Sequence, residues 1–326
     1  MKAGWERTHD FIMPDIDTVR KILTPFLKGK RVTDMEPLSG GLNNSNIKIT
    51  TDTKECFVLR IYSKRNDSPG KETAILNLLS EKVPVPSVLY SDRSCFVFSK
   101  PFMVLSWIPG LPFSEMLTKK DIACTTTLAA AIGETLANIH HITFSDSGFL
   151  DEDLNIKEKI KLDAEMFVIF IKESMEKGFG EKHIGTGMSA EVLRFSLLEN
   201  IGVQNKLVHS DFNPLNIFVN GSTLSAVLDW EYALSSSPLL DIGNMVRYES
   251  LDSTLLEPFV EGYLHNGGHL PEQWLQKAKL LDFMALFDLL NKEHCGERRR
   301  QDITRIIRRT IEDWEQYDRI QQSFTE

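Results

Sequence analysis

The sequence predicts an α+β protein with two lobes: a small lobe built on an antiparallel β-sheet and a larger, mainly helical lobe. Between residues 32 and 62, apolar and polar residues alternate in short runs, as in half-buried strands. Beyond residue 112, apolar residues recur every three or four positions, the helical period. The segment Pro109-Gly110-Leu111-Pro112 breaks both periods. We therefore divide the chain into residues 1–107 and 108–326.

In the small lobe, a first helix is predicted where Val19, Ile22 and Leu23 share one face, with Gly29 at its end. Antiparallel strands should follow, joined through the turn-rich stretch at residues 39–44. After a short helix, Pro84 and Pro86 force an extended chain. The patterns predict helices over residues 19–27 and 72–79 and strands over 47–49, 57–61, 95–99 and 102–107.

The large lobe is predicted to be helical apart from one β segment. This segment runs from Leu207 to Trp230 and contains an Asn220-Gly221 turn. Residues 178–189 hold four glycines and are predicted to form a loop. Arg298, Arg299 and Arg300 should form a solvated start to the last helix. Helices are predicted over residues 128–139, 162–171 and 303–314.

Composition excludes several classes of protein. The 326 residues carry 37 basic and 46 acidic side chains, a net charge of −9, which argues against a nucleic-acid partner. The four cysteines are far apart, so a disulfide scaffold or a zinc knuckle is not expected, as in a reducing cytoplasm. The chain starts without an apolar signal segment, and no run approaches the roughly 18 apolar residues of a membrane span. We expect a cytoplasmic enzyme or binding protein that contacts neither nucleic acid nor membrane.

One stretch of sequence carries a recognisable chemistry. His209-Ser210-Asp211 is followed by Asn216 and then by Asp229 at the end of a predicted strand, which is the order found in kinases. Phosphoryl transfer needs a carboxylate near the attacking hydroxyl, and Asp211 can accept its proton. It also needs hard oxygen ligands for Mg²⁺, which Asn216 and Asp229 offer. Each piece alone is commonly structural, but the whole pattern predicts a catalytic site in which His209 is a buried hydrogen-bonding scaffold.

With these residues, the chain resembles the aminoglycoside phosphotransferase and choline kinase superfamily from about Leu38 to about Val246. The resemblance implies a protein-kinase-like fold, ATP or GTP as phosphoryl donor and Mg²⁺ as cofactor. It implies that Asp211 is the catalytic base and that Asn216 and Asp229 bind the metal. Asp241 and His140 match further motifs of the family, where both are mainly structural.

The resemblance also assigns roles in nucleotide binding to the small lobe. Ser39, Gly40 and Gly41 stand where the family has its phosphate-covering loop, although Gly-Gly in a hairpin is also ordinary turn chemistry. Ser106 belongs to the segment matching the hinge that pairs with the purine. Glu72 stands where kinases have the glutamate that orients a strand lysine, although a lone glutamate is more often a solvated helix charge. Here that strand carries Arg60, which is also cationic and can bind phosphate in a fork.

The acceptor is less well defined by the sequence. Glu231 follows the motif of Asp229, and Glu249 follows that of Asp241. Both could bind an ammonium group, although Glu231 could instead be a local hydrogen-bonding residue and Glu249 a surface charge. This favours a small, cationic acceptor such as an aminoglycoside. Two alternatives stay open: a choline, ethanolamine or other metabolite kinase with aromatic cation contacts, and a catalytically silent nucleotide-binding module, which Arg60 suggests. The purine, the acceptor hydroxyl and the oligomeric state are not predicted.

Overall fold

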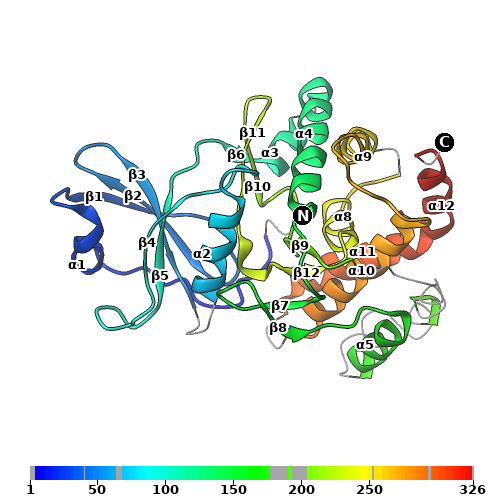
Figure 1. The fold of residues 1–326 in the computed structure, drawn as a ribbon, viewed down its shortest axis with the longest axis horizontal. Coiled ribbons are helices and arrows are strands. Elements are labelled where there is room, and N and C mark those ends of the chain that lie inside the picture. Colours follow the sequence, from blue (N-terminus) through cyan, green and yellow to red (C-terminus); the bar gives the residue numbers. More distant parts are fainter. Residues whose placement is uncertain are drawn as a thin grey trace.

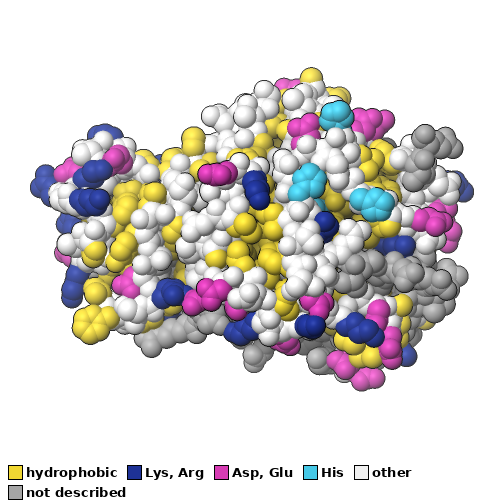
Figure 2. Space-filling model, viewed as in Figure 1, with side chains coloured by type: hydrophobic (Ala, Val, Ile, Leu, Met, Phe, Trp, Pro, Cys, Tyr) yellow, Lys and Arg dark blue, Asp and Glu magenta, His cyan; other side chains and the backbone are white. Residues whose placement is uncertain are grey.

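The computed structural model describes residues 4–39, 41–63, 68–119, 121–176, 190–192, 204–251, 253–292 and 295–324. Figure 1 shows two lobes side by side, a β-sheet lobe and a larger helical lobe. The predicted fold class, a two-lobed kinase-like α+β protein, is confirmed. Charged side chains of both signs are spread over the visible face of both lobes (Figure 2).

The small lobe contains an antiparallel five-stranded sheet with the strand order β1-β2-β3-β5-β4. The turn-rich stretch predicted at residues 39–44 joins the first two strands. β3 pairs with β5 from Phe57 opposite Ser106 to Ile61 opposite Phe102. The strands are β1 (Val32–Pro37), β2 (Ser45–Thr51), β3 (Cys56–Ile61), β4 (Val88–Asp92) and β5 (Phe102–Ser106).

The two faces of this sheet have different partners because side chains alternate along a strand. Phe57, Leu59 and Ile61 of β3 pack with α1 (Ile16–Leu27) in a separate core of the small lobe. The intervening Val58 and Arg60 face the other side, toward α2 (Ser68–Leu79) and the large lobe. Figure 1 shows α2 between the sheet and the large lobe. The alternation therefore directs Arg60 toward the junction of the lobes.

The large lobe surrounds two small sheets with helices. β6 (Leu111–Pro112) in the linker pairs with β10 (Ile217–Asn220), which pairs with β11 (Thr223–Val227), so the linker contacts this strand pair directly. The second sheet has the order β8-β7-β12-β9, formed by β8 (Ile156–Lys159), β7 (Gly148–Leu150), β12 (Leu234–Ser236) and β9 (Lys206–Val208). The helices are α3 (Phe113–Thr118), α4 (Ile122–His140), α5 (Ala164–Glu176), α8 (Leu239–Met245), α9 (Leu256–His265), α10 (Trp274–Leu290), α11 (Glu297–Glu312) and α12 (Trp314–Gln322).

The central helix α4 packs closely against α9 (Figure 1). A Cβ atom added to Gly133 would lie 2.0 Å from the carbonyl oxygen of Phe259, and one added to Gly262 would lie 2.2 Å from that of Ala130. The two backbones can therefore approach only because both positions lack side chains. Among the described residues, α4 alone is long and apolar enough to cross a membrane by length and composition. Its Leu128, Ile132 and Leu136 are fully buried in the core.

Several predicted elements need correction. No strand forms at residues 95–99, where Phe96 is 92% exposed, and the partner of β5 at the sheet edge is β4 (Val88–Asp92) instead. The last predicted helix is two helices, because α11 ends at Glu312 and α12 begins at Trp314. Strands β7, β8 and β12 are short and were not predicted. The first helix ends at Leu27, and its C-cap residue is Lys28, which adopts the left-handed conformation, and not Gly29. The predicted loop at 178–189 lies outside the described residues.

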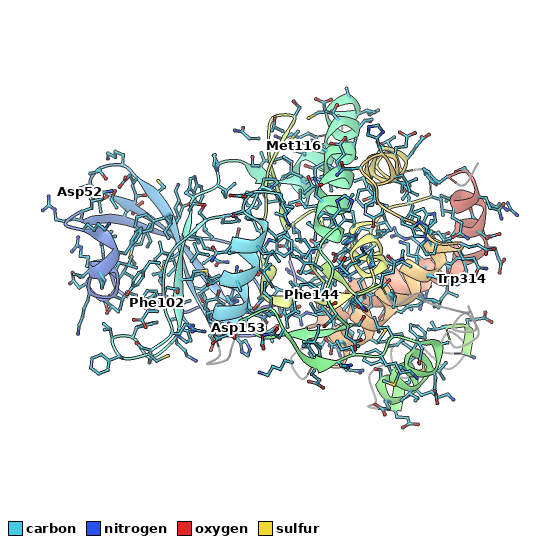
Figure 3. All side chains as sticks on the ribbon, viewed as in Figure 1. Asp52, Phe102, Met116, Phe144, Asp153 and Trp314 are labelled. Atoms are coloured by element: carbon cyan, nitrogen blue, oxygen red, sulfur yellow. The ribbon has the colours of Figure 1, made fainter. Side chains whose placement is uncertain are left out.

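Phe102 belongs to the small-lobe core, and Trp314, which belongs to the larger core, lies near the opposite end of the molecule (Figure 3). Arg299 of α11, predicted to be solvated, is fully buried. Arg298 is exposed, as predicted.

Replacing Gly133 with alanine should destabilise the large lobe. The added methyl group meets backbone atoms, which cannot rotate away, so α4 and α9 must separate. We expect a loss of roughly 3 kcal/mol in unfolding free energy, at the upper end of overpacking effects. Denaturant unfolding of Gly133→Ala measures it, with Glu134→Ala on the exposed side of the same helix as the control. Equal stability of the two variants would contradict the proposed close contact.

Candidate active site

The loop between β9 and β10 is fixed by the carboxylate of Asp241, which lies in the first turn of α8 and is fully buried. Its two oxygens accept hydrogen bonds from the backbone N–H groups of His209 and Ser210, both at 2.7 Å. The Nε2 atom of His140 lies 3.2 Å from the same carboxylate. Ser210 has a φ of 65°, a costly conformation for a non-glycine residue, which these contacts maintain. Asp241 and His140 are thus structural residues of the loop.

The side chain of His209 connects this loop to the end of β11. Its Nδ1 atom accepts a hydrogen bond from the backbone N–H of Asp211 at 3.2 Å. The proton therefore resides on Nε2, which donates to the carbonyl of Leu228 at 2.8 Å. The ring is buried, and its centroid lies 4.5 Å from the ring centroid of Trp230. His209 is a scaffold residue that sets the distance between Asp211 and Asp229.

The carboxylate of Asp211 is oriented by two amides. Asn213 Nδ2 donates to Oδ1 and Asn216 Nδ2 donates to Oδ2, both at 3.0 Å, and each amide also donates to the carbonyl of Asp211. These bonds keep the carboxylate in one rotamer. They also turn the Oδ1 atom of Asn216 away from Asp211, so that this oxygen is suited to bind a cation.

Arg60 joins the two lobes through an ion-pair network. Its Nη1 atom lies 3.2 Å from Glu72 Oε1, and its Nη2 atom donates to Asp229 Oδ1. Glu72 is 1% exposed and also accepts a 2.6 Å hydrogen bond from the Tyr62 hydroxyl. Burial opposes the charge on Arg60, but Glu72 and Asp229 outweigh it and hold the pKa of Arg60 above its usual value. Glu72 is thus the partner of the strand cation.

Glu72 is positioned by the helical period of α2, because Glu72, Ile75, Leu76 and Leu79 lie on one face and are all buried. The neighbouring Lys71 donates to the carbonyl of Ala233 at 3.0 Å, which ties α2 to the segment after Asp229. Burial raises the pKa of Glu72, against the effect of Arg60. The contact with Arg60 is therefore a buried pair whose two members depend on each other.

The loop between β1 and β2 contacts Glu231 in the large lobe. Asn44 Nδ2 donates to Glu231 Oε2 at 2.8 Å, and Asn43 Nδ2 lies 3.4 Å from Oε1 and also contacts the Tyr232 hydroxyl. Burial and then the nearby Asp229 carboxylate raise the pKa of Glu231 to about 7. The two asparagines thus place the loop between β1 and β2 against the segment that follows Asp229.

These residues surround a cleft of about 230 Å³ between the lobes. Of the predicted site residues, Asp211, Asn216, Asp229 and Glu231 line it. Arg60 and Glu72 reach it through Asp229. The rest of the lining comprises Thr8, Leu42, Asn43, Ser210, Asn213, Leu215, Tyr232, Asn244, Arg247, Ala285, Asp288, Leu289, Lys292 and Arg299.

The other predicted site residues are not part of this lining. Ser39 is exposed, Gly41 offers its carbonyl to Arg7, and Gly40 lies outside the described residues. Ser106 ends β5, and its hydroxyl accepts a hydrogen bond from the backbone of Ser87 at 2.9 Å. Glu249 accepts a hydrogen bond from the Ser253 hydroxyl.

The chain start and α11 also contribute to the cleft, although no sequence motif predicts this. Thr8 lines the cleft and donates its backbone N–H to Leu42 at 2.9 Å, while Arg7 contacts the carbonyls of Gly41 and Asn44. Nothing in the local sequence predicts these long-range contacts. Arg299 did leave a signal, because Arg299, Ile303, Ile306 and Thr310 form one buried stripe of α11 at helical spacing.

The two lobes, the positioned carboxylate in the cleft and the cation held by a helix glutamate define a kinase-like phosphotransferase. A family profile described as "Phosphotransferase enzyme family" matches residues 34–275, and the chain belongs to this family. It is a phosphotransferase with an alcohol group as acceptor.

Two sequence relatives are homoserine kinases. The enzyme of Zymomonas mobilis is 22% identical over 69% of this chain and 68% of its own length. The enzyme of Methylocella silvestris is 24% identical over 62% of this chain and 60% of its own length, so the match spans less than two thirds of that relative.

Solved structures of the same fold include two aminoglycoside phosphotransferases. Aminoglycoside 2'-phosphotransferase-IIIa, in a complex with GDP, has a TM-score of 0.68 at 15% identity, covering 92% of this chain and 99% of its own. A mutant of APH(4)-Ia with ADP and hygromycin B has a TM-score of 0.63 at 15% identity, covering 89% and 97%. At this identity the structures show the shared fold.

Replacing Asp211 with asparagine should lower kcat much more than it weakens nucleotide binding. The amide keeps the size of the side chain but cannot accept the proton of the acceptor, which costs on the order of 10²–10⁴ in rate, or roughly 3–5 kcal/mol of barrier. Steady-state kinetics together with nucleotide titration measure both effects. A variant that keeps more than half of the wild-type kcat would remove Asp211 from the role of base.

Proposed function

We propose that the protein transfers the γ-phosphoryl group of ATP or GTP to a hydroxyl of a small acceptor that carries an ammonium group, such as an aminoglycoside. The observation that carries the proposal is the Asp211 carboxylate, held by two amides in a cleft that Asn216 and Asp229 also line. This combination of a proton acceptor and two cation-binding oxygens is what phosphoryl transfer requires.

The transfer step assigns one role to each group. The acceptor oxygen attacks the γ-phosphorus and forms a new P–O bond, while the bond to the β,γ-bridging oxygen breaks and the nucleoside diphosphate leaves with that electron pair. Asp211 accepts the hydroxyl proton, and its fixed rotamer keeps the carboxylate ready for it. Arg60 contributes positive charge near the phosphates and, as an always charged side chain, can replace a lysine there.

The oxygens in the cleft fit Mg²⁺. Among the residues that the structure describes, no group of three or more His, Cys, Asp or Glu side chains is arranged to hold a metal ion. Mg²⁺ is typically bound by one or two protein oxygens with substrate phosphates and water, so Asn216 Oδ1 and Asp229 would suffice. When bound, the ion would neutralise phosphate charge.

The silent-module alternative is less well supported than catalysis. Arg60 is paired with Glu72 and reaches Asp229, so the change from lysine preserves the link between strand cation, helix glutamate and metal carboxylate. As to the donor, the structural relatives are solved with ADP and with GDP, which leaves both purines in the proposal.

We propose that Glu231, which lines the cleft, binds the ammonium group of the acceptor. Glu249 does not line it, so we confine the proposal to Glu231. Choline and ethanolamine, the alternative acceptors, also carry an ammonium group, and Tyr232 in the cleft could contact it. Homoserine, the substrate named for the sequence relatives, is a second candidate with the same group. We further propose a cytoplasmic location, with nucleotide and acceptor as the only partners.

A phosphate-transfer assay with mass detection tests the proposal. Purified protein with Mg²⁺ and ATP or GTP is incubated with aminoglycosides, choline, ethanolamine and homoserine, alongside Asp211→Asn. Transfer to one acceptor by the wild type alone supports the function, and nucleotide binding without transfer to any of them contradicts it.

Replacing Asp229 with alanine should abolish Mg²⁺-dependent nucleotide binding, whereas Asn216→Ala should weaken it less. A carboxylate neutralises part of the charge of the metal ion, while an amide only coordinates it. Nucleotide titrations at several Mg²⁺ concentrations measure the order of the two effects. If Asp229→Ala binds the Mg²⁺ nucleotide like the wild type, the metal assignment is wrong.

The acceptor KM should rise with ionic strength, and Glu231→Gln should raise it several-fold with little change in nucleotide KM. A charge-assisted contact is worth about 1.5–3 kcal/mol, and its exposed part is screened over about 8–10 Å. Glu249→Gln, outside the cleft lining, is the matched control. A salt-independent KM with unchanged behaviour of Glu231→Gln would leave the kinase chemistry in place and exclude the ammonium contact.

A further inference from the structure

A second cation borders the cleft without a carboxylate partner. Arg299 of α11 is fully buried and lines the cleft. Its Nη2 atom donates to the carbonyl of Glu6, and its guanidinium lies 5.5 Å from the ring centroid of Trp5. Its Nε and Nη1 atoms have no hydrogen-bond partner among the described residues. Two of the three guanidinium nitrogens of this cleft-lining residue are thus buried with their hydrogen-bonding capacity unused.

The nearby Glu6 does not neutralise this charge by a direct ion pair. Its carboxylate instead accepts the backbone N–H groups of Arg298 and Arg299, at 3.2 and 3.4 Å, at the start of α11. Within the described part of the chain, no carboxylate oxygen forms a salt bridge with Arg299. Arginine stays charged in proteins, and a buried charge without a partner is costly. A binding site for an anion accounts for this arrangement.

Arg247, in the same lining, adds to the positive charge of the cleft. It is 1% exposed and forms a two-pronged ion pair with Asp282, from Nε at 2.9 Å and from Nη2 at 2.6 Å. Its Nη1 atom is left without a partner in the residues described. Asp282 compensates the charge of Arg247, so this residue offers one hydrogen-bond donor, whereas Arg299 offers two donor nitrogens and has no direct ion pair with a carboxylate among the described residues.

We propose that Arg299, assisted by Arg247, binds a carboxylate group of the acceptor. This inference rests on the proposed function and deepens it, because the acceptor would then carry an ammonium, a carboxylate and the hydroxyl that is phosphorylated. That combination is a hydroxy amino acid. Aminoglycosides, choline and ethanolamine have the ammonium group and lack the carboxylate.

The other charges of the cleft favour a carboxylate over a phosphate. Asp211, Asp229, Glu231 and Asp288 also line the cleft. A doubly charged phosphate group would be repelled by these side chains about twice as strongly as a singly charged carboxylate. The volume of about 230 Å³ must also leave room for the transferred phosphoryl group, which suits an amino acid.

The test compares binding of acids with their uncharged analogues. L-serine, L-threonine and L-homoserine, and the carboxamide of each, are titrated by calorimetry into the full-length protein with Mg²⁺ and ADP. We expect at least one acid to bind about tenfold or more tightly than its amide, the effect of one charge-assisted contact. Equal binding of every acid and its amide, or no binding of any acid, overturns the proposal.

Arg299→Met should remove the preference for the acid, because the acid loses a charge-assisted contact and therefore more affinity than the amide. Arg298→Met, one residue away and exposed, is the matched control and should keep the preference. Because methionine at a buried position could impair folding, Arg299→Lys provides a second variant that keeps the charge and loses the fork. It should retain part of the preference. Folded Arg299→Met protein with the full preference of the wild type overturns the assignment to Arg299.

Phosphoryl-transfer assays on the same compounds separate the two proposals. Transfer to an aminoglycoside or choline, with none to the acids, overturns the carboxylate site and leaves the phosphotransferase function standing. Absence of transfer to all of them would count against the proposed function, while the comparison of acid and amide binding still decides whether the carboxylate site exists.

Discussion

The site depends on one buried carboxylate. The Asp241 carboxylate accepts hydrogen bonds from two successive backbone N–H groups, those of His209 and Ser210, and so defines the conformation of the loop before Asp211. A charged acceptor makes stronger hydrogen bonds than a neutral one, and a buried N–H group without a partner would cost free energy. The left-handed φ of Ser210 is maintained by this constraint. The position of Asp211 in the cleft follows from it.

From that loop, polar contacts lead to the small lobe. His209 fixes the loop to Leu228, the next residue is Asp229 with its own left-handed φ of 70°, and Asp229 meets Arg60. Arg60 then reaches Glu72 on α2. Since the strand alternation places Arg60 on the face of the sheet opposite α1, this side chain links the orientation of the small lobe to the position of the Asp229 carboxylate. A shift of α2 would therefore alter both.

Much of this arrangement could be predicted from the sequence. The spacing of Asp211, Asn216 and Asp229 indicates a catalytic loop because few structural motifs need these types in this order, and period-two alternation locates β2 and β3. The error at residues 95–99 has a physical cause: a short apolar run reports β propensity and cannot report whether a neighbouring strand is available. The basic residues of the cleft could not be predicted for a related reason. Arg299 is buried because α11 packs against residues near the chain start, and a local sequence pattern does not report such a long-range contact.

The contact between the chain start and α11 has a consequence for biosynthesis. Trp5 donates to Asp302 and Glu6 caps the start of α11, while the adjacent Arg7 and Thr8 contact the loop between β1 and β2. Nearly 300 residues separate the two sides of this contact. During translation, when N-terminal segments can fold first, residues 5–8 must wait until α11 has left the ribosome. The nascent chain therefore completes the cleft only after α11 has been synthesised, and truncation within α11 would disturb residues 5–8.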